Sequence, residues 1–420
     1  MKVFKFGGAS LKNADAIRNV ASIIKAHGQE ELLVVLSAMG ATTDALEKII
    51  ALAQIGKSFD HELNAIRDYH HDIIKGLFSH STNLIEKLLS FLQEIKLAAL
   101  LKGEYDFIYD QVIGYGEIIS STIVYELLAH ENSTAEWIDS RKYIQTDSSF
   151  REGQIHWKET EKKLNGLKSV LKNGIVIAQG FIGANEKNET VSLGREGSDF
   201  SASIFGAALK AESVTIWKDV PGLMNADPKR IATAVVFEEL PYKETAEMTY
   251  YGASVIHPKT VKPLANRHIP LLVKSFIDPS LPGTKIHDCH VDKLPPLIVH
   301  KENQSLISCR VTDYTFINEE QLGHIFHAIS ESGMRINVMQ NSAISFSFCV
   351  DYMENRVLKL IGLLSKKFEV FYNTGLTLVT IKNYDQKTFN EYRNLQGVIL
   401  EQSSRSALQV LVKEPVRLSA

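Results

Sequence analysis

Along residues 1–290, short continuous apolar runs alternate with longer stretches in which apolar residues recur at helical spacing. The continuous runs are ELLVVLSAMG, GIVIAQGFIG, SVTIWKDVPG and IPLLVKSF, which are typical of strands buried on both faces of a parallel sheet. Residues 42–56, 61–77 and 116–130 are predicted as helices between them. The alternation predicts an α/β fold, an open sheet with helices on both faces. Ligands of such sheets bind beyond the carboxyl ends of the strands.

The pattern changes in the last third of the chain. Residues 278–300 are rich in proline, glycine and charge and are predicted as a linker. Strand-like and helix-like stretches then follow in the order βαββαβ, which indicates a small ferredoxin-like α+β module over 303–376. A shortened repeat of this pattern predicts a second module over 377–420. The chain is therefore predicted to contain one large domain, 1–295, and two small modules.

Composition limits the classes of partner. A net charge of −3 over 420 residues gives no electrostatic drive toward nucleic acid or anionic lipid. We find no apolar run near the roughly 20 residues of a membrane span, and no signal-peptide pattern. Three scattered cysteines suit a reducing cytoplasm better than a disulfide framework. The segment HDCH, residues 287–290, looks like half a metal site, but no second cluster completes it. We therefore expect a solvated linker there and no metal ligands.

The first ten residues, MKVFKFGGAS, place a lysine and two glycines at the end of a short strand. Gly7 and Gly8 allow backbone N–H groups to approach a bulky anion, and a following helix would point its positive end at the same place. Lys5 adds a full charge, and Ser10 adds a hydroxyl. These features favour a polyphosphate site, although strand–Gly-Gly–helix junctions are also common without a ligand. No Walker or protein-kinase pattern occurs in the chain.

The densest polar cluster is SLGREGSDFSAS, in which Gly194 and Gly197 bracket Arg195. The planar fork of an arginine matches a carboxylate or a phosphate. Ser198 and Asp199 follow at a predicted helix start and could also be only a helix cap. An arginine between two glycines has no packing reason to be there, so we favour a functional interpretation.

Other polar groups follow predicted strands or open predicted helices: Thr42, Thr43, Glu117, Lys218, Asp219, Asp227 and Lys229. Glu117 suits a helix N-terminus and could also hold a substrate ammonium. The loop after Lys218 could lie along a nucleotide or be an ordinary Pro-Gly turn. Positive groups for phosphates, with one arginine and one glutamate for a zwitterion, together predict phosphoryl transfer to an amino acid.

These motifs resemble those of the aspartokinases of the amino-acid kinase family. KFGGAS resembles KFGGTS, LGREGSDFSAS resembles LGRGGSD with Tyr or Phe, IWKDVPGLMNADP resembles the TDVxG…DP loop, and EMTYYGASVIHPKT resembles EM…FGAKVLHP. The resemblance implies a three-layer α/β sandwich followed by ferredoxin-like ACT modules. It implies ATP- and Mg²⁺-dependent phosphorylation of L-aspartate to 4-phospho-L-aspartate, the first step toward lysine, threonine and methionine. It also implies a cytoplasmic homodimer or higher homo-oligomer paired through the ACT modules, with an amino-acid effector as a further partner.

The resemblance also implies roles for single residues. Lys5 and Asp199 would be catalytic. The aspartate-binding residues would be Thr43, Glu117, Arg195 and Ser198. The nucleotide-binding residues would be Lys5, Gly7, Gly8, Ser10, Lys218, Asp219, Asp227, Lys229 and Lys259.

Departures from the family pattern affect both the nucleotide and the effector. Ser254 stands where the family has a lysine, and Met224 where it has a tyrosine. We expect Lys218 or Lys259 to supply the missing charge.

At the first ACT-like helix the chain reads INEEQLGH, so Glu319 and Glu320 lie where an effector carboxylate would bind, and Asn337 replaces a family aspartate. We therefore expect lysine to inhibit the enzyme weakly or not at all. Two alternatives stay open: another amino-acid kinase, such as a glutamate kinase, or a catalytically weak, ligand-sensing regulatory subunit.

Overall fold

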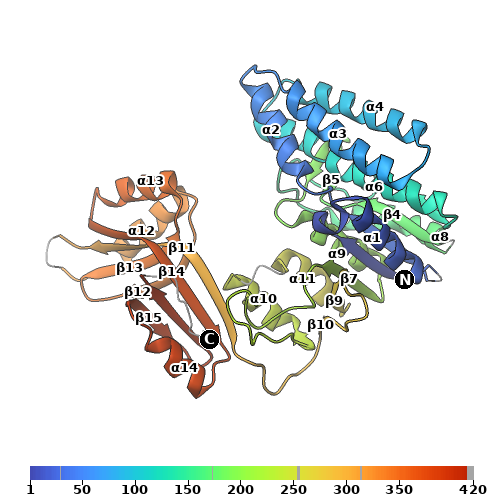
Figure 1. The fold of residues 1–420 in the computed structure, drawn as a ribbon. Coiled ribbons are helices and arrows are strands. Elements are labelled where there is room, and N and C mark those ends of the chain that lie inside the picture. The colour runs from blue at the N-terminus through green and yellow to red at the C-terminus, as the bar shows by residue number, and fades with distance from the viewer. Residues whose placement is uncertain (29, 173, 253–255, 313–314, 414–420) are drawn as a thin grey trace. The chain divides into compact units, whose positions relative to one another are not determined.

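The computed structural model describes residues 1–28, 30–172, 174–252, 256–312 and 315–413. They form two compact units (Figure 1). The first unit comprises Met1–Leu223, Val236–Ala246 and Ser254–Val291. The second unit comprises Met224–Val235, Glu247–Ala253 and Asp292–Ala420.

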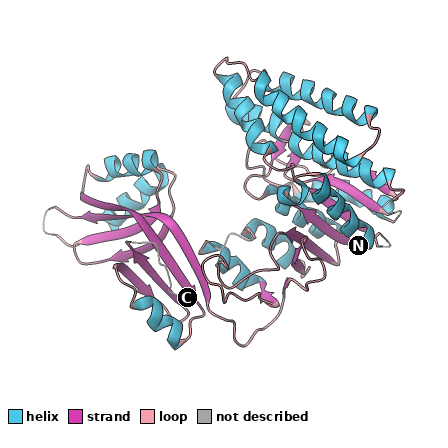
Figure 2. Cartoon of the chain, viewed as in Figure 1, coloured by secondary structure: helices cyan, strands magenta, loops and turns pink. Residues whose placement is uncertain are grey.

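The first unit is built on a predominantly parallel sheet with helices around it, drawn in magenta and cyan in Figure 2. The strand order of this sheet is β3-β4-β2-β1-β7-β9-β10-β8. Its strands are β1 (Lys2–Phe6), β2 (Leu32–Leu36), β3 (Ala135–Trp137), β4 (Ile175–Gln179), β7 (Ser213–Lys218), β8 (Glu239–Pro241), β9 (Leu271–Ser275) and β10 (Thr284–His287). Only the β9–β10 pair is antiparallel. A separate hairpin pairs β5 (Ile182–Ala184) with β6 (Thr190–Ser192).

The helices of the first unit are α1 (Ala14–Ala26), α2 (Thr42–Gln54), α3 (Asp60–Leu77), α4 (Thr82–Ala99), α5 (Tyr105–Ile113), α6 (Tyr115–His130), α7 (Trp157–Asn165), α8 (Leu167–Leu171), α9 (Gly197–Leu209), α10 (Tyr242–Tyr250) and α11 (Pro258–Ala265). Two 3₁₀ turns are Gly8–Leu11 and Ser140–Lys142. The predicted strands and the predicted helices 42–56, 61–77 and 116–130 are confirmed to within a few residues.

The alternation of side chains along β1 decides which residues reach which face of the sheet. Phe4 and Phe6 join a large core with side chains of α1 and α6. The Phe6 ring stacks on Trp217 of β7 with 5.8 Å between the ring centroids. Because neighbouring residues of a strand point to opposite faces, Lys5 points away from this core. It faces the other side, where α9 packs on β1.

One stretch of the first unit bears on the sequence expectation about membrane spans. The stretch Tyr105–His130 is long and apolar enough, by length and composition, to be a candidate span. It consists of α5 and α6, and 78% of its apolar window is buried inside the protein, as in core helices.

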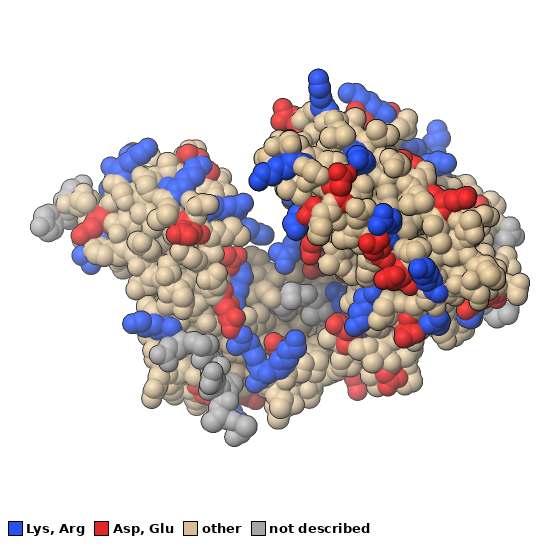
Figure 3. Space-filling model, turned by 45° about the horizontal axis from the view of Figure 1, so that its top comes forward, with Lys and Arg blue, Asp and Glu red and all other residues tan. Residues whose placement is uncertain are grey.

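On the face shown in Figure 3, basic and acidic side chains are mixed, in keeping with the small net charge.

The second unit contains an antiparallel sheet ordered β12-β13-β11-β14-β16-β15. Its elements are β11 (Leu297–Arg310), α12 (Glu319–Glu331), β12 (Ile336–Asn341), β13 (Ser345–Asp351), α13 (Glu354–Leu364), β14 (Glu369–Lys382), α14 (Gln386–Arg393), β15 (Val398–Ser403) and β16 (Ala407–Val412). The βαββαβ order is confirmed, followed by one helix and two strands. The two central strands, β11 and β14, pair along their whole lengths and join both sets of strands into one sheet.

The predicted linker over 278–300 is partly wrong. Residues Thr284–His287 form β10, and β11 begins at Leu297. Both strands alternate buried and less buried residues, TKIH in the first and LIVHK in the second. The prolines and charges around these short alternating stretches hid the pattern in the sequence. His287, expected in a solvated segment, is therefore the last residue of a strand.

Candidate active site

A cleft of about 960 Å³ opens at the carboxyl ends of β1, β2, β4 and β7. Eight of the candidate residues line it: Lys5, Gly8, Thr43, Glu117, Arg195, Ser198, Asp199 and Lys218. They come from segments separated by up to about two hundred residues of chain. The position agrees with the expectation for an open α/β sheet.

A buried carboxylate between two lysines forms one wall of this cleft. Asp199, in the first turn of α9, is 3% exposed, and its Oδ1 lies 2.6 Å from Lys5 Nζ. Its Oδ2 lies 3.6 Å from Lys218 Nζ. Lys5 and Lys218 share a face because Lys5 pairs with Ile216, two residues before Lys218. Burial raises the pKa of Asp199, but the two lysines outweigh it and the pKa lies below its usual range. One carboxylate thus holds two ammonium groups, leaving net positive charge.

Glu117 forms a second buried carboxylate in the cleft, in the first turn of α6. Its Oε1 accepts the Ala38 N–H at 3.1 Å. Its Oε2 is buried and has no hydrogen-bond partner among the residues that the structure describes. Burial raises the pKa of Glu117 to about 8, against the opposing effects of the Ala38 N–H and Lys5. The close approach of α6 to Ala38 requires a glycine at position 116, because a Cβ there would lie 2.7 Å from the Ala38 Cβ. A buried acid with one unused oxygen is suited to receive a cationic ligand group.

Arg195 lies on the loop that leads into α9. Gly194, with φ +76°, and Glu196, with φ +53°, both adopt the left-handed conformation beside it. Glu196 is anchored by accepting the His257 N–H at 2.8 Å, at the start of α11. The Arg195 side chain is exposed and makes no hydrogen bond or ion pair with any residue that the structure describes. An exposed guanidinium on a loop anchored in this way can bind a carboxylate or a phosphate through two parallel N–H groups.

The structure adds a residue that the sequence reasoning missed, Asp110 of α5. Its buried carboxylate accepts the Ser192 hydroxyl (2.6 Å), the Ser192 N–H (2.9 Å) and the Arg151 N–H (2.8 Å). Burial raises its pKa to about 6 despite these hydrogen bonds. Ser192 and Arg151 both line the cleft, and Arg151 has φ +68°. Asp110 therefore fixes one rim of the cleft. Nothing in the local sequence signals it, because its partners lie 41 and 82 residues away.

Replacing Asp110 by alanine is expected to lower the free energy of unfolding by about 3 kcal/mol, because three donors lose a buried acceptor. Urea unfolding followed by circular dichroism measures this change. Asp106→Ala is the matched control on the same helix. The Asp106 side chain is 58% exposed, so its loss should change stability by less than about 0.5 kcal/mol. Equal free energies of unfolding for Asp110→Ala and Asp106→Ala would contradict the inference that Asp110 fixes this rim of the cleft.

The remaining candidate residues do not line the cleft. Gly7 is next to it, since a Cβ there would lie 3.3 Å from Lys5 Nζ. The Ser10 hydroxyl is buried and donates to the Gly7 carbonyl at 2.6 Å. Asp219 is an exposed residue after β7. Asp227 and Lys229 belong to the second unit, where Asp227 Oδ1 accepts the Lys229 N–H at 2.9 Å.

The hypothesis of a replacement lysine can be examined only in part, because Ser254 lies outside the described residues. Lys218 lines the cleft directly. Lys259, on α11, is close to the cleft wall: a Cβ on Gly194 would lie 3.7 Å from its Nζ.

The described residues of the cleft do not form a metal cage of their own. The single group of three His, Cys, Asp or Glu donors found among the described residues lies elsewhere, at Glu239, His287 and Cys289. The Asp199 carboxylate is already paired with Lys5 and Lys218. This donor set fits an ion that arrives on phosphate oxygens and keeps its waters, the usual way in which Mg²⁺ enters nucleotide sites.

Comparison with known proteins places the chain among related sequences. The sequence model of the amino acid kinase family matches residues 1–275. The lysine-sensitive aspartokinase 3 of Escherichia coli (strain K12) is 31% identical over 355 residues, which are 83% of this chain and 78% of that protein. The chloroplastic bifunctional aspartokinase/homoserine dehydrogenase 2 of Arabidopsis thaliana is 31% identical over 391 residues, 89% of this chain. The chain spans 42% of the length of that bifunctional relative.

Two crystal structures of E. coli aspartokinase III match almost the whole chain. The complex with lysine and aspartate has a TM-score of 0.84 at 27% identity, and the complex with aspartate and ADP has a TM-score of 0.82 at 28% identity. Each match covers 98% of this chain and 96% of the other. The predicted fold class, an α/β sandwich followed by ACT-like α+β modules, is confirmed.

Proposed function

The chain belongs to the amino acid kinase family, and we propose that it transfers the γ-phosphoryl group of ATP to the side-chain carboxylate of L-aspartate. The observation that carries this proposal is the unused buried oxygen of Glu117, in the same cleft as Arg195 and the Lys5–Asp199–Lys218 group. Glu117 would bind the substrate ammonium and Arg195 its α-carboxylate, with Thr43 and Ser198 beside them. E. coli aspartokinase III was solved in complex with aspartate and ADP, which supports L-aspartate and ATP as the two substrates.

The proposed reaction needs no general base. The attacking group is a carboxylate with a pKa near ~4, which is ionised at neutral pH. One of its oxygens forms a bond to the γ-phosphorus while the bond to the bridging oxygen of ADP breaks, and no proton moves. Catalysis is then alignment plus neutralisation of charge on the phosphoryl oxygens. Lys5 and Lys218 would supply that charge, with Asp199 orienting both. Mg²⁺, when bound to the phosphates, would withdraw further charge.

The remaining roles carried by the resemblance stay proposals. Gly7, Gly8 and Ser10 would surround the phosphates, and Asp219, Asp227, Lys229 and Lys259 would contact the nucleotide. We further propose a catalytic domain over 1–295, with modules over 303–376 and 377–420 that pair subunits. Three free cysteines, Cys289, Cys309 and Cys349, support a reducing cytoplasmic location.

Acyl phosphate formation tests the proposal. Purified protein with ATP and Mg²⁺ is given L-aspartate or L-glutamate, and hydroxylamine traps the product as a hydroxamate. We expect product with aspartate and at least about a hundredfold less with glutamate, because an extra methylene misplaces the attacking oxygen. Preference for glutamate would identify another amino-acid kinase. Aspartate binding without product would identify a ligand-sensing subunit.

Lys218 is our first candidate for the missing family lysine. Lys218→Met is expected to raise KM for ATP about tenfold, which corresponds to about 1.4 kcal/mol of lost interaction. Lys259→Met, measured in the same initial-rate assay, should have a smaller effect because Lys259 is not among the residues that line the cleft. If both variants keep the ATP affinity of the unmodified protein, neither lysine compensates.

Inhibition by lysine is expected to be weak. The N-terminus of α12 is already closed by a capping box of Asn318 and Gln321, and it carries Glu319 and Glu320. Lys301 Nζ already donates to Asn337 Oδ1 at 2.8 Å and lies 2.9 Å from Asp351 Oδ1. The helix N-terminus is thus already capped and carries two carboxylates, which disfavours binding of an effector carboxylate. Titration of the initial rate with lysine and with threonine measures the effect, and half-inhibition by micromolar lysine would refute this expectation.

A further inference from the structure

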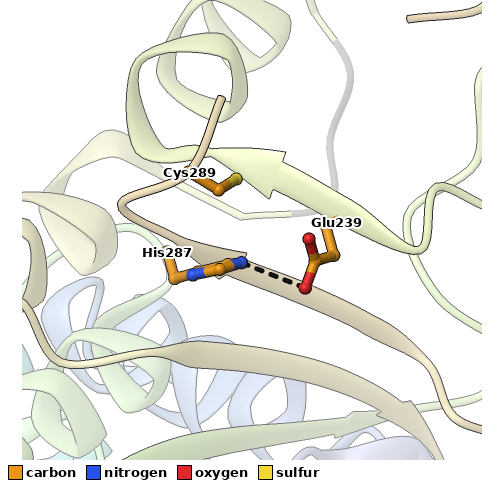
Figure 4. Close-up of side chains that lie close together, drawn as sticks. All are labelled: Glu239, His287 and Cys289. Carbon is orange, nitrogen blue, oxygen red and sulfur yellow. Dashed lines mark ion pairs between the residues drawn. The ribbon is translucent and has the colours of Figure 1, made fainter. Parts of the chain in front are cut away.

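Three different donor side chains meet at one edge of the first unit's sheet, outside the cleft (Figure 4). Glu239 opens β8, His287 ends β10, and Cys289 follows two residues later. The carboxylate oxygen, imidazole nitrogen and sulfur of these residues all lie within 4.8 Å of one another. His287 Nε2 is 3.2 Å from Glu239 Oε1. From this arrangement we propose that Glu239, His287 and Cys289 bind a zinc ion.

The pairing of β8 with β10 creates this arrangement. The two strands are parallel, and Lys285 is paired with Glu239. His287 lies two residues beyond Lys285 and therefore on the same face of the sheet as Glu239. Cys289 continues along the same side immediately after the strand ends. The sequence segment HDCH supplied only two of the donors, and the third lies 48 residues earlier in the chain.

The His287 ring presents a buried nitrogen that a metal ion could bind. Its Nε2 is buried, yet it makes no hydrogen bond of acceptable geometry with any described residue, although the Glu239 carboxylate is near. Buried polar atoms normally have a partner. A metal ion bound to Nε2 would provide one, and Glu239 Oε1 would then be a second ligand of the same ion.

The separations suit tetrahedral zinc. With bonds of about 2.0–2.3 Å to nitrogen, oxygen and sulfur, neighbouring ligands of tetrahedral zinc lie about 3.3–3.6 Å apart. The 3.2 Å between His287 Nε2 and Glu239 Oε1 is close to this value. The Cys289 sulfur lies within 4.8 Å of both atoms, so it would have to approach them by up to about 1.3 Å on binding. A fourth position is left for water.

The three donor atoms also disfavour Mg²⁺ and Ca²⁺ as the bound ion, and a reactive cysteine as the alternative role. Thiolate and imidazole select zinc and related transition metals over Mg²⁺ or Ca²⁺, which prefer oxygen. A reactive cysteine is disfavoured, because burial and the nearby Glu239 and Asp288 carboxylates raise the pKa of the Cys289 thiol. A bound metal would stabilise the thiolate instead.

Glu239 and Cys289 each lie shortly before a point at which the chain passes from the first unit to the second. Glu239 precedes α10, whose second half belongs to the second unit, and Cys289 precedes Asp292, where the second unit resumes. A metal here would cross-link two of the three stretches through which the chain leaves the first unit. Its expected role is therefore structural, and it does not depend on the proposed reaction.

Cobalt titration tests the site. Full-length protein is freed of metal with a chelator and titrated with Co²⁺ alone, and Zn²⁺ is then added in competition. We expect one equivalent of Co²⁺, a thiolate-to-cobalt charge-transfer band in the near ultraviolet, and its displacement by Zn²⁺. Cys289→Ser should abolish that band. Glu239→Gln and His287→Ala should each weaken binding at least about tenfold.

His268→Gln is the matched control, because His268 is an exposed histidine that pairs with Asp288 next to the site without belonging to it. It should leave stoichiometry and spectrum unchanged. Circular dichroism of each variant establishes that it is folded, and Glu239→Gln changes only an exposed group. Binding of less than one equivalent, or a spectrum unaffected by Cys289→Ser, would reduce the cluster to a simple His287–Glu239 ion pair and overturn the proposal.

Discussion

Replacing Lys5 by methionine is expected to lower kcat about 10²- to 10³-fold, the usual cost of removing one group that stabilises charge in a transition state. Methionine keeps most of the side-chain volume, so the change isolates the charge. The Lys5 ammonium is 2.6 Å from Asp199 Oδ1, and the Lys5 side chain is only 11% exposed. Lys218 alone would then face both Asp199 and the phosphoryl group. Steady-state rates with aspartate and ATP measure the loss.

Lys2→Met is the matched control, because Lys2 lies on the same strand but pairs with Glu30 at the surface. Its kcat should stay within about twofold of the unmodified protein. The Lys5 variant should still bind ADP, since Lys218 and the loop glycines remain. A kcat within a few-fold of normal for Lys5→Met would mean that this lysine does not touch the transferred group. Loss of ADP binding as well would assign Lys5 to binding rather than to catalysis.

Replacing Glu117 by glutamine is expected to raise KM for aspartate about 10- to 100-fold, because a hydrogen bond between two charged groups, worth about 1.5–3 kcal/mol, is lost. Glutamine keeps the acceptor for the Ala38 N–H, so the fold around α6 should persist. Glu126→Gln controls for the substitution itself, since Glu126 is on the same helix and pairs with Lys87 at the surface. Equal KM values for the two variants would exclude Glu117 from substrate binding.

The same residue predicts a pH dependence of aspartate affinity. The pKa of Glu117 is about 8 in the free protein, so the acid is mostly neutral at pH 7 and must lose its proton when an ammonium binds. Affinity should therefore rise about tenfold per pH unit below pH 8 and level off above it. Calorimetry in buffers of different ionisation enthalpy should detect one released proton. Asp110, with a pKa of about 6, also titrates near the cleft. Glu117→Gln keeps Asp110, so a slope that persists in this variant would belong to Asp110.

Much of the fold followed from local patterns. Runs such as LLVVL and IVIAQ are buried throughout in the structure, and both became parallel strands of the sheet. The helices over 42–56 and 61–77 were visible because their apolar residues recur on one face. The helix over 116–130 is apolar and buried on most sides. The sequence was misleading where strands are short or interrupted: β10 has four residues, and β11 begins inside the predicted linker. A four-residue strand carries too few alternations to stand out from a loop.

The sequence by itself determined many of the residues that could do chemistry and the ends of the buried parallel strands, because glycines, lone arginines and strand-end lysines are local signals. Lys5, Arg195 and Asp199 were found in this way, and their roles stay predictions. Only the tertiary structure decided which of these groups meet. It brought Asp110 to Ser192 across 82 residues and Glu239 to His287 across a strand pair. Burial then set the pKa of Glu117, since the loss of water around a carboxylate depends on packing from distant segments and leaves no mark in the neighbouring sequence.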